Sequence, residues 1–174
     1  MRRTLTGSLV ALIAVSYLLQ ITIAGYEDRL LLNRFYVDSG EYYRLITVAL
    51  LHGGLWHLAF NIYALHALGT PVEAYFGRRK YIVILLVSLL SGSTLSVLFN
   101  PAYVYSIGAS GMIFGLFGSL ALIGQRVGIE WRSILVIVGI NFAIGFVLGG
   151  VDWRGHLGGL IGGTLVTTIL NRTK

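Results

Sequence analysis

The sequence contains no cysteine and little charge: only 11% of its 174 residues are Asp, Glu, Lys or Arg. Without cysteine the chain has no disulfide, no thiol nucleophile and no thiolate metal site. Soluble globular domains carry roughly a quarter charged residues, so this chain lacks the polar side chains that a soluble surface needs. Together with a hydrophobic content of 56%, the shortage of charge excludes an ordinary soluble domain and indicates a membrane protein.

Long apolar runs, in contrast, are abundant. A transmembrane helix needs about 20 apolar residues, and runs near this length recur six times with short connections between them. We therefore predict an all-α membrane protein, a bundle of six transmembrane helices that forms one domain over residues 1–174. The runs lie at about Leu5–Gly25, Thr47–Gly69, Tyr81–Phe99, Gly108–Gly124, Ser133–Val151 and Gly155–Leu170.

The first run has an alternative interpretation, because Met1-Arg2-Arg3 followed by an apolar stretch resembles a secretory signal peptide. The apolar core of a signal peptide is usually about 7–15 residues long, and this run is longer. We therefore favour a first helix that stays in the protein.

The net charge of +6 is spread over the ends of the apolar runs rather than gathered on one basic face, so nucleic acid is not an expected partner. Cytoplasmic loops of membrane proteins are enriched in Lys and Arg. With the N-terminus inside, the inner segments hold nine Lys and Arg residues and the outer ones four. We therefore predict a multi-pass protein of the cell (plasma) membrane, surrounded by the lipid bilayer, with both termini in the cytoplasm. The sequence does not indicate an oligomeric state.

Polar side chains inside membrane helices are costly, so each is a functional candidate. The second run contains His57 and Asn61, which are four residues apart and hence on one helix face. Ser110 lies at the start of the fourth run and His156 at the start of the sixth. In the predicted orientation the second, fourth and sixth helices all begin at the outer surface. We therefore expect His57, Ser110 and His156 at a similar depth in the outer leaflet.

Two rows of glycines predict that the fourth and sixth helices pack closely. Small residues at this spacing let helix backbones approach each other in lipid. Close approach is needed for a serine hydroxyl to reach an imidazole at about 3 Å, so we predict that Ser110 contacts His156. The rows are Gly111, Gly115 and Gly118 in the fourth run, and Gly159 and Gly163 in the sixth.

These residue types suit acyl transfer by a serine nucleophile. A neutral serine hydroxyl attacks poorly, so we predict Ser110 as the nucleophile and His156 as the base that takes its proton. The oxyanion that forms needs preorganised donors, a role predicted for His57 and Asn61 together with backbone N–H groups near Ser110. Asp152, four residues before His156, is a candidate for an acid that orients the histidine. We favour a surface position for Asp152 and a Ser–His dyad.

The other polar residues have simpler interpretations. His52 is expected to buttress the first loop, His66 to be solvated or structural, and Asn141 to join helices by hydrogen bonding. A metal site formed by histidines is disfavoured, because His52, His57 and His156 have no carboxylate or thiolate at ligand spacing. We predict neither a metal nor another cofactor.

The motifs resemble those of the rhomboid family of intramembrane serine proteases, in its minimal six-helix prokaryotic form. Residues 52–61 (HGGLWHLAFN) match the family pattern of two histidines and an asparagine, and residues 69–77 (GTPVEAYFG) resemble the segment that closes the second helix. Residues 108–118 match the nucleophile motif GxSGxxxGxxG, and residues 155–163 resemble the AHxxGxxxG motif of the sixth helix. GxSG alone is a weak signal, but three motifs in order on the expected helices are specific.

The resemblance implies a compact helical bundle around a water-filled cavity that is open to the outside. It also implies that Ser110 is the nucleophile and His156 the base, that the substrates are single-pass transmembrane proteins cleaved near the outer membrane interface, and that no cofactor is needed. His57 and Asn61 are similar to the oxyanion-stabilising pair of the family. One departure is Phe114, which stands where tyrosine is common; a ring against the histidine is kept and a hydroxyl is lost.

Two other departures from the family pattern are mild. Tyr43-Arg44 stands in place of Trp-Arg, and Gly155 replaces alanine before the histidine.

Two other functions compete with that of a protease. A catalytically inactive rhomboid-like protein would bind and escort membrane proteins, but such relatives typically lack the serine or the histidine, and both are present here. A small channel or transporter is expected to have paired charges or broken helices near the membrane midplane, and we find none. We therefore predict a serine-type endopeptidase.

Overall fold

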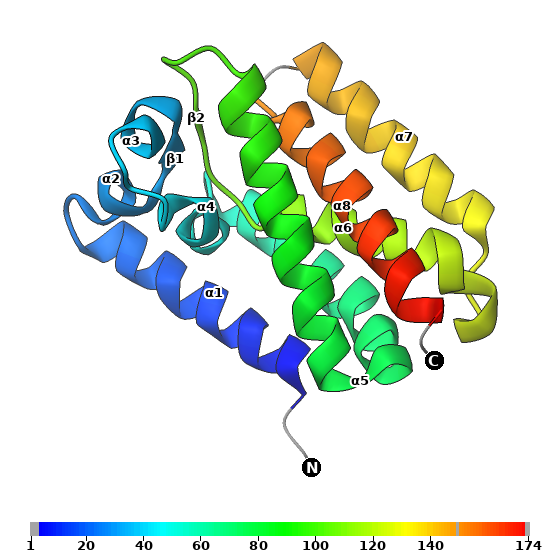
Figure 1. Ribbon diagram of the computed structural model, residues 1–174. Helices are drawn as coiled ribbons and strands as arrows, with labels where there is room; N and C mark the ends of the chain where they lie inside the picture. Colours follow the sequence, from blue (N-terminus) through cyan, green and yellow to red (C-terminus); the bar gives the residue numbers. More distant parts are fainter. Residues whose placement is uncertain (1–3, 149, 173–174) are drawn as a thin grey trace.

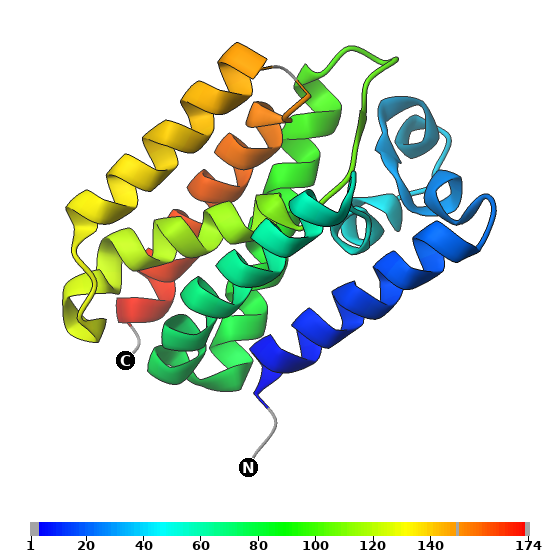
Figure 2. The same ribbon diagram turned by 180° about the vertical axis from the view of Figure 1, so that it is seen from behind.

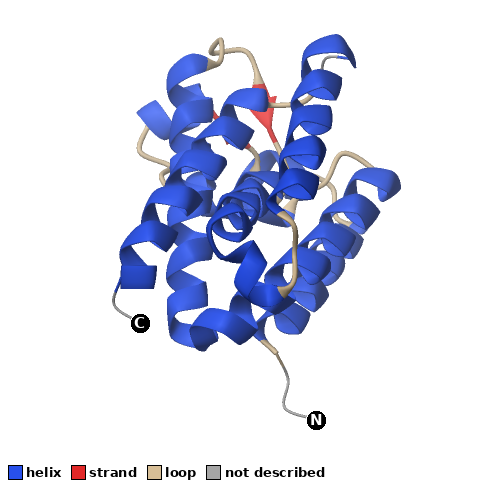
Figure 3. Cartoon of the chain, turned by 90° about the vertical axis from the view of Figure 1, so that its right-hand side faces the viewer, coloured by secondary structure: helices blue, strands red, loops and turns tan. Residues whose placement is uncertain are grey.

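The computed structural model describes residues 4–148 and 150–172, apart from the side chains of residues 144–148. Arg2, Arg3 and Lys174, which contribute to the predicted orientation, lie outside these residues, and so does Gly149 near the end of the fifth predicted run. Most of the described chain is helical (Figure 1), and two short strands lie among the helices (red in Figure 3).

Long helices dominate the described part of the chain. They are α1 (Leu5–Thr22), α5 (Leu55–Phe99), α6 (Ser110–Ile123), α7 (Trp131–Leu148) and α8 (Trp153–Arg172). α5 is interrupted at Gly77, whose backbone angles (φ 75°, ψ 164°) are not helical, so the second and third predicted runs form its two halves. Three of the described helices, α1, α5 and the stretch Ser110–Val127, are long and apolar enough to cross a membrane. The predicted helical class is thus confirmed, whereas the number of six crossings stays a prediction.

Glycines with positive φ precede two helices, and one of the two, α5, begins later than the sequence predicts. A helix was expected from Thr47, but α5 begins at Leu55, directly after Gly54 with φ 136°. His52 accordingly lies in the connection before α5 and not in the helix. α6 begins two residues after Gly108, which has φ 130°. Residues with a side chain rarely adopt this region, so the glycines set where both helices start.

Short elements connect the long helices. Between α1 and α5 they are α2 (Tyr26–Leu30), β1 (Leu32–Asn33), α3 (Arg34–Asp38), α4 (Arg44–Thr47) and the 3-10 helix η1 (Val48–Leu50). β2 (Tyr105–Ser106) precedes α6, and the 3-10 helix η2 (Gly124–Val127) follows it. β1 and β2 pair antiparallel, with Leu32 opposite Ser106. The segment after α1 is therefore tied to the loop that leads into α6.

Arg44 organises the segment between α1 and α5. Its side chain is 4% exposed, although arginine is rarely buried unless it is paired. The guanidinium donates to the carbonyl oxygens of Asp28 and Leu31, at 2.8 Å each, and forms a salt bridge with Glu41 at 2.7 Å. It also lies over the ring of Tyr36, 4.0 Å from the centroid. One buried cation thus satisfies carbonyl groups that would otherwise lack donors.

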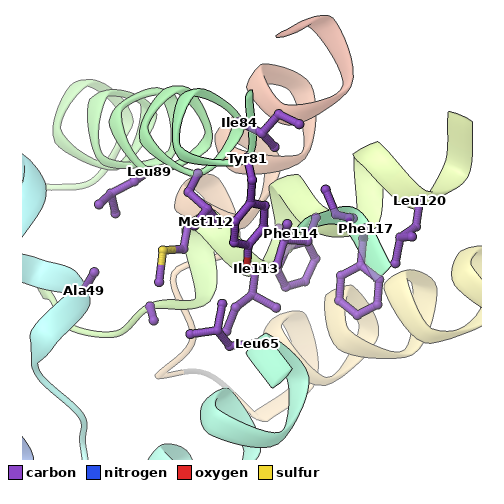
Figure 4. Close-up of a cluster of buried hydrophobic side chains, with 14 of the residues drawn as sticks. Ala49, Leu65, Tyr81, Ile84, Leu89, Met112, Ile113, Phe114, Phe117 and Leu120 are labelled. Atoms are coloured by element: carbon purple, nitrogen blue, oxygen red, sulfur yellow. The ribbon is translucent and has the colours of Figure 1, made fainter. Parts of the chain in front are cut away.

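The core lies where α5, α6 and α8 meet. These three helices pack against one another, while α1 and α7 lie at opposite edges of the molecule in Figures 1 and 2. Figure 4 shows Leu65 and Tyr81, from the two halves of α5, together with Phe114 and Phe117 of α6, and all four side chains are buried. Van der Waals packing of this kind holds membrane helices together, because lipid tails are as apolar as the side chains.

Glycines bring the backbones of α6 and α8 into contact. A methyl group added at Gly159 would overlap the carbonyl oxygen of Gly111, and one added at Gly163 would overlap the backbone of Gly115. Any larger residue at these two positions of α8 would push the helices apart. The close approach predicted from the two glycine rows is therefore present.

Candidate active site

Ser110 and His156 form a hydrogen bond between the two glycine-packed helices. Ser110 is the first residue of α6, and His156 lies in the first turn of α8. His156 Nε2 and Ser110 Oγ are 2.8 Å apart, which is the separation expected for a nucleophile and its base. The predicted contact is present, while the catalytic roles of the two residues stay predictions.

Aromatic rings hold the imidazole of His156 in place. The ring stacks on Phe114, with centroids 4.0 Å apart and 14° between the planes, and Phe142 meets it edge-on with centroids 6.4 Å apart. The His156 side chain is only 7% exposed. Its Nδ1 has no hydrogen-bond partner among the described residues, so no acid from that part of the chain orients the ring by direct contact.

His57 approaches Ser110 from the start of α5. Its Nδ1 accepts a hydrogen bond from the Gly53 N–H at 3.1 Å, so the proton of the neutral ring is on Nε2. A methyl group placed on Gly108 would lie 3.1 Å from His57 Nε2 and 3.7 Å from Ser110 Oγ. The Nε2 edge of His57 therefore lies beside Gly108, next to the serine, where it can donate a hydrogen bond.

Asn61 is buried one turn further along α5. Its Nδ2 donates to the carbonyl oxygen of His57 at 2.9 Å, and its Oδ1 has no hydrogen-bond partner among the described residues. An amide nitrogen carries two N–H groups, so one donor is left over. The structure thus brings His57 next to Ser110, while part of the Asn61 amide is held by its own helix.

The remaining polar candidates lie away from the reacting atoms. His52 is buried, and its ring packs at an angle against that of His57 with centroids 5.1 Å apart. His66 is exposed. Asn141 was expected to join two helices, which is wrong: its Nδ2 donates at 2.8 Å to the Ile137 carbonyl of α7, because an amide in a helix can reach back one turn. In the part of the chain that the structure describes, no three His, Asp or Glu side chains gather where they could hold a metal ion.

Asp152 is not the surface residue that we expected. Its carboxylate is partly buried and accepts hydrogen bonds from Ser106 Oγ (2.7 Å), Asn100 Nδ2 (3.0 Å) and the Gly155 N–H (3.1 Å). Burial raises the pKa of this carboxyl, but the surrounding hydrogen bonds lower it by more, so the pKa lies below its usual value. The expectation failed because Asn100 and Ser106 are distant from Asp152 in the sequence.

A small cavity of about 30 Å³ adjoins Ser110 and His156. Cavities above about 10–15 Å³ with polar partners can hold a water molecule, so there is room for one beside the serine. The polar side chains that line the cavity, besides these two, are Ser93, Ser96, Ser106 and Asp152.

Gln20 of α1 is a residue that the sequence predictions missed. Its Nε2 donates to the His52 carbonyl at 3.0 Å and to Glu27 at 2.8 Å, and its Oε1 accepts from the His52 N–H at 2.9 Å. The amide therefore clamps the backbone just before His57. A single amide inside the apolar run 5–25 is the signal that would have found it, because polar groups within membrane helices are costly.

Comparison with known sequences identifies the family of this chain. A family model described as the rhomboid domain matches residues 39–173. The chain is 40% identical over 143 residues to the rhomboid protease GluP of Bacillus subtilis (strain 168), and 35% identical over 144 residues to RHOMBOID-like protein 4 of Arabidopsis thaliana. These alignments cover 79% and 77% of this chain, but the chain spans only 28% and 35% of the two relatives.

A relative of more similar length is YdcA of Bacillus subtilis (strain 168). It is 31% identical over 146 residues, which make up 79% of this chain and 72% of YdcA. The family model covers most of the chain, and the apolar helices have the length that a bilayer requires. The chain is therefore an integral membrane protein that belongs to the rhomboid family.

Proposed function

We propose that this chain is an intramembrane serine protease that cleaves single-pass transmembrane proteins near the outer membrane interface. The observation that carries the proposal is the hydrogen bond of 2.8 Å between Ser110 Oγ and His156 Nε2. Membership of the rhomboid family and the likeness to GluP, which is named a rhomboid protease, support it.

The reaction begins with a proton transfer. Neutral His156 accepts the hydroxyl proton through Nε2 as Ser110 Oγ attacks the scissile carbonyl carbon. The imidazolium then donates this proton to the leaving amine, and water hydrolyses the acyl-enzyme with His156 again as the base. The cavity of about 30 Å³ beside Ser110 is large enough for that water.

Donors for the oxyanion come from two helices. The first-turn N–H groups of α6, at Ser110, Gly111 and Met112, have no helical carbonyl partner, and the positive end of the helix dipole lies there. From α5 come the Nε2–H of His57 and the second amide N–H of Asn61. Removal of one such donor typically costs roughly 3–4 kcal/mol of transition-state stabilisation.

We further propose that six helical segments cross the membrane, with both termini in the cytoplasm and the dyad in the outer leaflet. The two halves of α5 count separately, because the chain reverses at the break at Gly77 and the two halves run antiparallel (Figure 1). Arg78, Arg79 and Lys80 follow this break, and the break lies at the same end of the bundle as the start of α1 and the end of α8 (Figure 1). A cluster of cations at this end favours its cytoplasmic location.

Cleavage by the purified protein tests the proposed function. In detergent or in liposomes we expect it to cut a single-pass transmembrane substrate, and we expect Ser110→Ala to lower the rate by at least about 10⁴-fold while the unfolding temperature is kept. His66→Ala is a matched histidine control, because His66 is exposed and outside the site. Cleavage by Ser110→Ala at the wild-type rate would refute the proposal. Binding of substrate by the wild type without any cleavage would favour the escort function instead.

A further inference from the structure

The hydrogen bond between Ser110 and His156 has a parallel four residues earlier in each segment. Ser106 precedes Ser110 by four residues, and Asp152 precedes His156 by four. Ser106 Oγ donates to Asp152 Oδ2 at 2.7 Å. The two segments that carry the proposed reacting groups are therefore joined at a second point, which lies outside the dyad.

Three elements meet at the Asp152 carboxylate. Its Oδ1 accepts from the Gly155 N–H at 3.1 Å, the geometry of a residue that caps the start of a helix, here α8. The same oxygen accepts from Nδ2 of Asn100, at the end of α5, at 3.0 Å. Arg154 Nη1 donates to Asn100 Oδ1 at 3.0 Å, which fixes the amide with its N–H groups toward the carboxylate. The end of α5, the strand β2 and the start of α8 are thus held by one group.

The space beside this carboxylate is tight. A methyl group added at Gly155 would lie 2.9 Å from Asp152 Oδ2 and 3.2 Å from Cγ. Alanine, which the family motif has at this position, would therefore press on the carboxylate oxygen that Ser106 binds. The glycine in this chain leaves room for the bond between Ser106 and Asp152.

The carboxylate also brings a negative charge close to the site. Its donors, a hydroxyl, an amide and a backbone N–H, are all neutral, and they keep the pKa of Asp152 low enough for the group to be ionised at neutral pH, although burial acts in the other direction. Asp152 lies four residues before His156, one helical turn away, and His57 is a further titratable group beside Ser110. The other charge nearby, on Arg154, is turned toward Asn100. Among the described side chains, α6 contacts the imidazole through Ser110 and Phe114 and α7 contacts it through Phe142, and none of these three is charged.

We propose that Asp152 is a positioning residue for the reaction of Ser110 and His156, a role that rests on the proposed function. Its carboxylate fastens the segment before Ser110 to the start of α8, and its charge, one helical turn from His156, stabilises the imidazolium that forms when Ser110 attacks. It is not a third member in contact with the dyad, because Nδ1 of His156 has no partner among the described residues.

Asp152→Asn removes the charge and keeps the shape of the side chain. We expect kcat for cleavage to fall by about tenfold with little change in KM, because no substrate contact is lost. Loss of a nearby anion disfavours the charged imidazolium, so His156 should become protonated only at a lower pH than in the wild type. Titration of ¹⁵N-histidine signals measures this directly, since the chain has four histidines. The acid limb of the kcat/KM profile should move to lower pH in parallel.

Two further variants separate the charge from the hydrogen bonds. Ser106→Ala keeps the charge of Asp152 and removes the hydrogen bond from Ser106 Oγ to its carboxylate. We therefore expect kcat to fall while His156 titrates close to the wild-type pH. Ser119→Ala is the matched control: Ser119 Oγ and Thr167 Oγ1 are 2.7 Å apart and join α6 to α8 away from the site. This control should leave both kcat and the titration of His156 unchanged.

An unchanged titration of His156 in folded Asp152→Asn, or wild-type kcat in Ser106→Ala, would overturn the role of Asp152. The titration needs no substrate, so it decides about the charge of Asp152 independently of cleavage. A shifted titration in a protein whose wild type cuts nothing would overturn the proposed function and leave the electrostatic coupling between Asp152 and His156 established.

Discussion

Phe114 shows how much a single residue contributes to the geometry of the candidate base. It lies four residues after Ser110, hence one turn along the same face of α6, and its ring stacks on His156 at 4.0 Å. The resemblance to the rhomboid family implied this ring, because the position four residues after the serine belongs to the family pattern. The environment of Asp152 could not be predicted from the sequence, because the partners Ser106 and Asn100 come from segments whose meeting depends on the complete fold.

We expect Phe114→Leu to lower kcat by about three- to tenfold. Leucine fills much of the same volume but does not stack, and aromatic pairs contribute roughly 0.5–1.5 kcal/mol beyond their buried area. The measurement is the cleavage rate per folded molecule. Phe114→Tyr keeps the ring and should stay near the wild-type rate. A leucine variant that cleaves as fast as the wild type would mean that stacking does not hold the base.

At the scale of elements, α1 has a role that the family match does not include. The matched residues begin at position 39, whereas α1 ends at Thr22. Nevertheless Gln20 in α1 makes two hydrogen bonds to the backbone of His52, and the Gly53 N–H that follows holds Nδ1 of His57. The positions of the helices follow from apolar runs, but a contact between α1 and this connection depends on how helices pack, which the runs do not encode.

We expect Gln20→Leu to lower both stability and activity. The N–H and C=O of His52 would lose their partners, and an unsatisfied buried group costs about 1–3 kcal/mol. Movement of this backbone would displace His57, so kcat per folded molecule should fall as well. Thermal unfolding in detergent and the cleavage rate test these two effects. Leu18→Ala is the control, because Leu18 lies two residues before Gln20 on the exposed side of α1. Equal losses of stability and activity in both variants would argue against a role for the hydrogen bonds between Gln20 and His52.

At the scale of the whole molecule, the glycine contacts between α6 and α8 decide whether the site exists. The sequence predicted these contacts from the spacing of Gly111, Gly115 and Gly118 against Gly159 and Gly163. It did not predict the late start of α5 or the pairing of β1 with β2, because Gly54 and the two-residue strands give no periodic signal. Long, regular features were therefore predictable, and short ones stabilised by distant partners were not.

We expect Gly159→Ala to separate α6 from α8 and to abolish most activity. The added methyl group would overlap the Gly111 carbonyl oxygen, and overpacking of this kind typically costs 1–3 kcal/mol. Gly139→Ala is a matched change in α7, where the methyl group would meet no atom within 4 Å, and it should behave like the wild type. Unfolding temperature and cleavage rate are the measurements. A stable and active Gly159→Ala would show that the two backbones can part without harm.

The backbone contact between α6 and α8 has a consequence for the energetics of the first chemical step. At Gly159 and Gly163 no side chain lies between the two helices. No side-chain rearrangement at these positions can therefore change the distance between the Ser110 hydroxyl and the His156 imidazole. In the proposed reaction the hydroxyl and the imidazole are already aligned in the resting protein, so little reorganisation free energy would have to be added to the activation barrier when a peptide bond arrives.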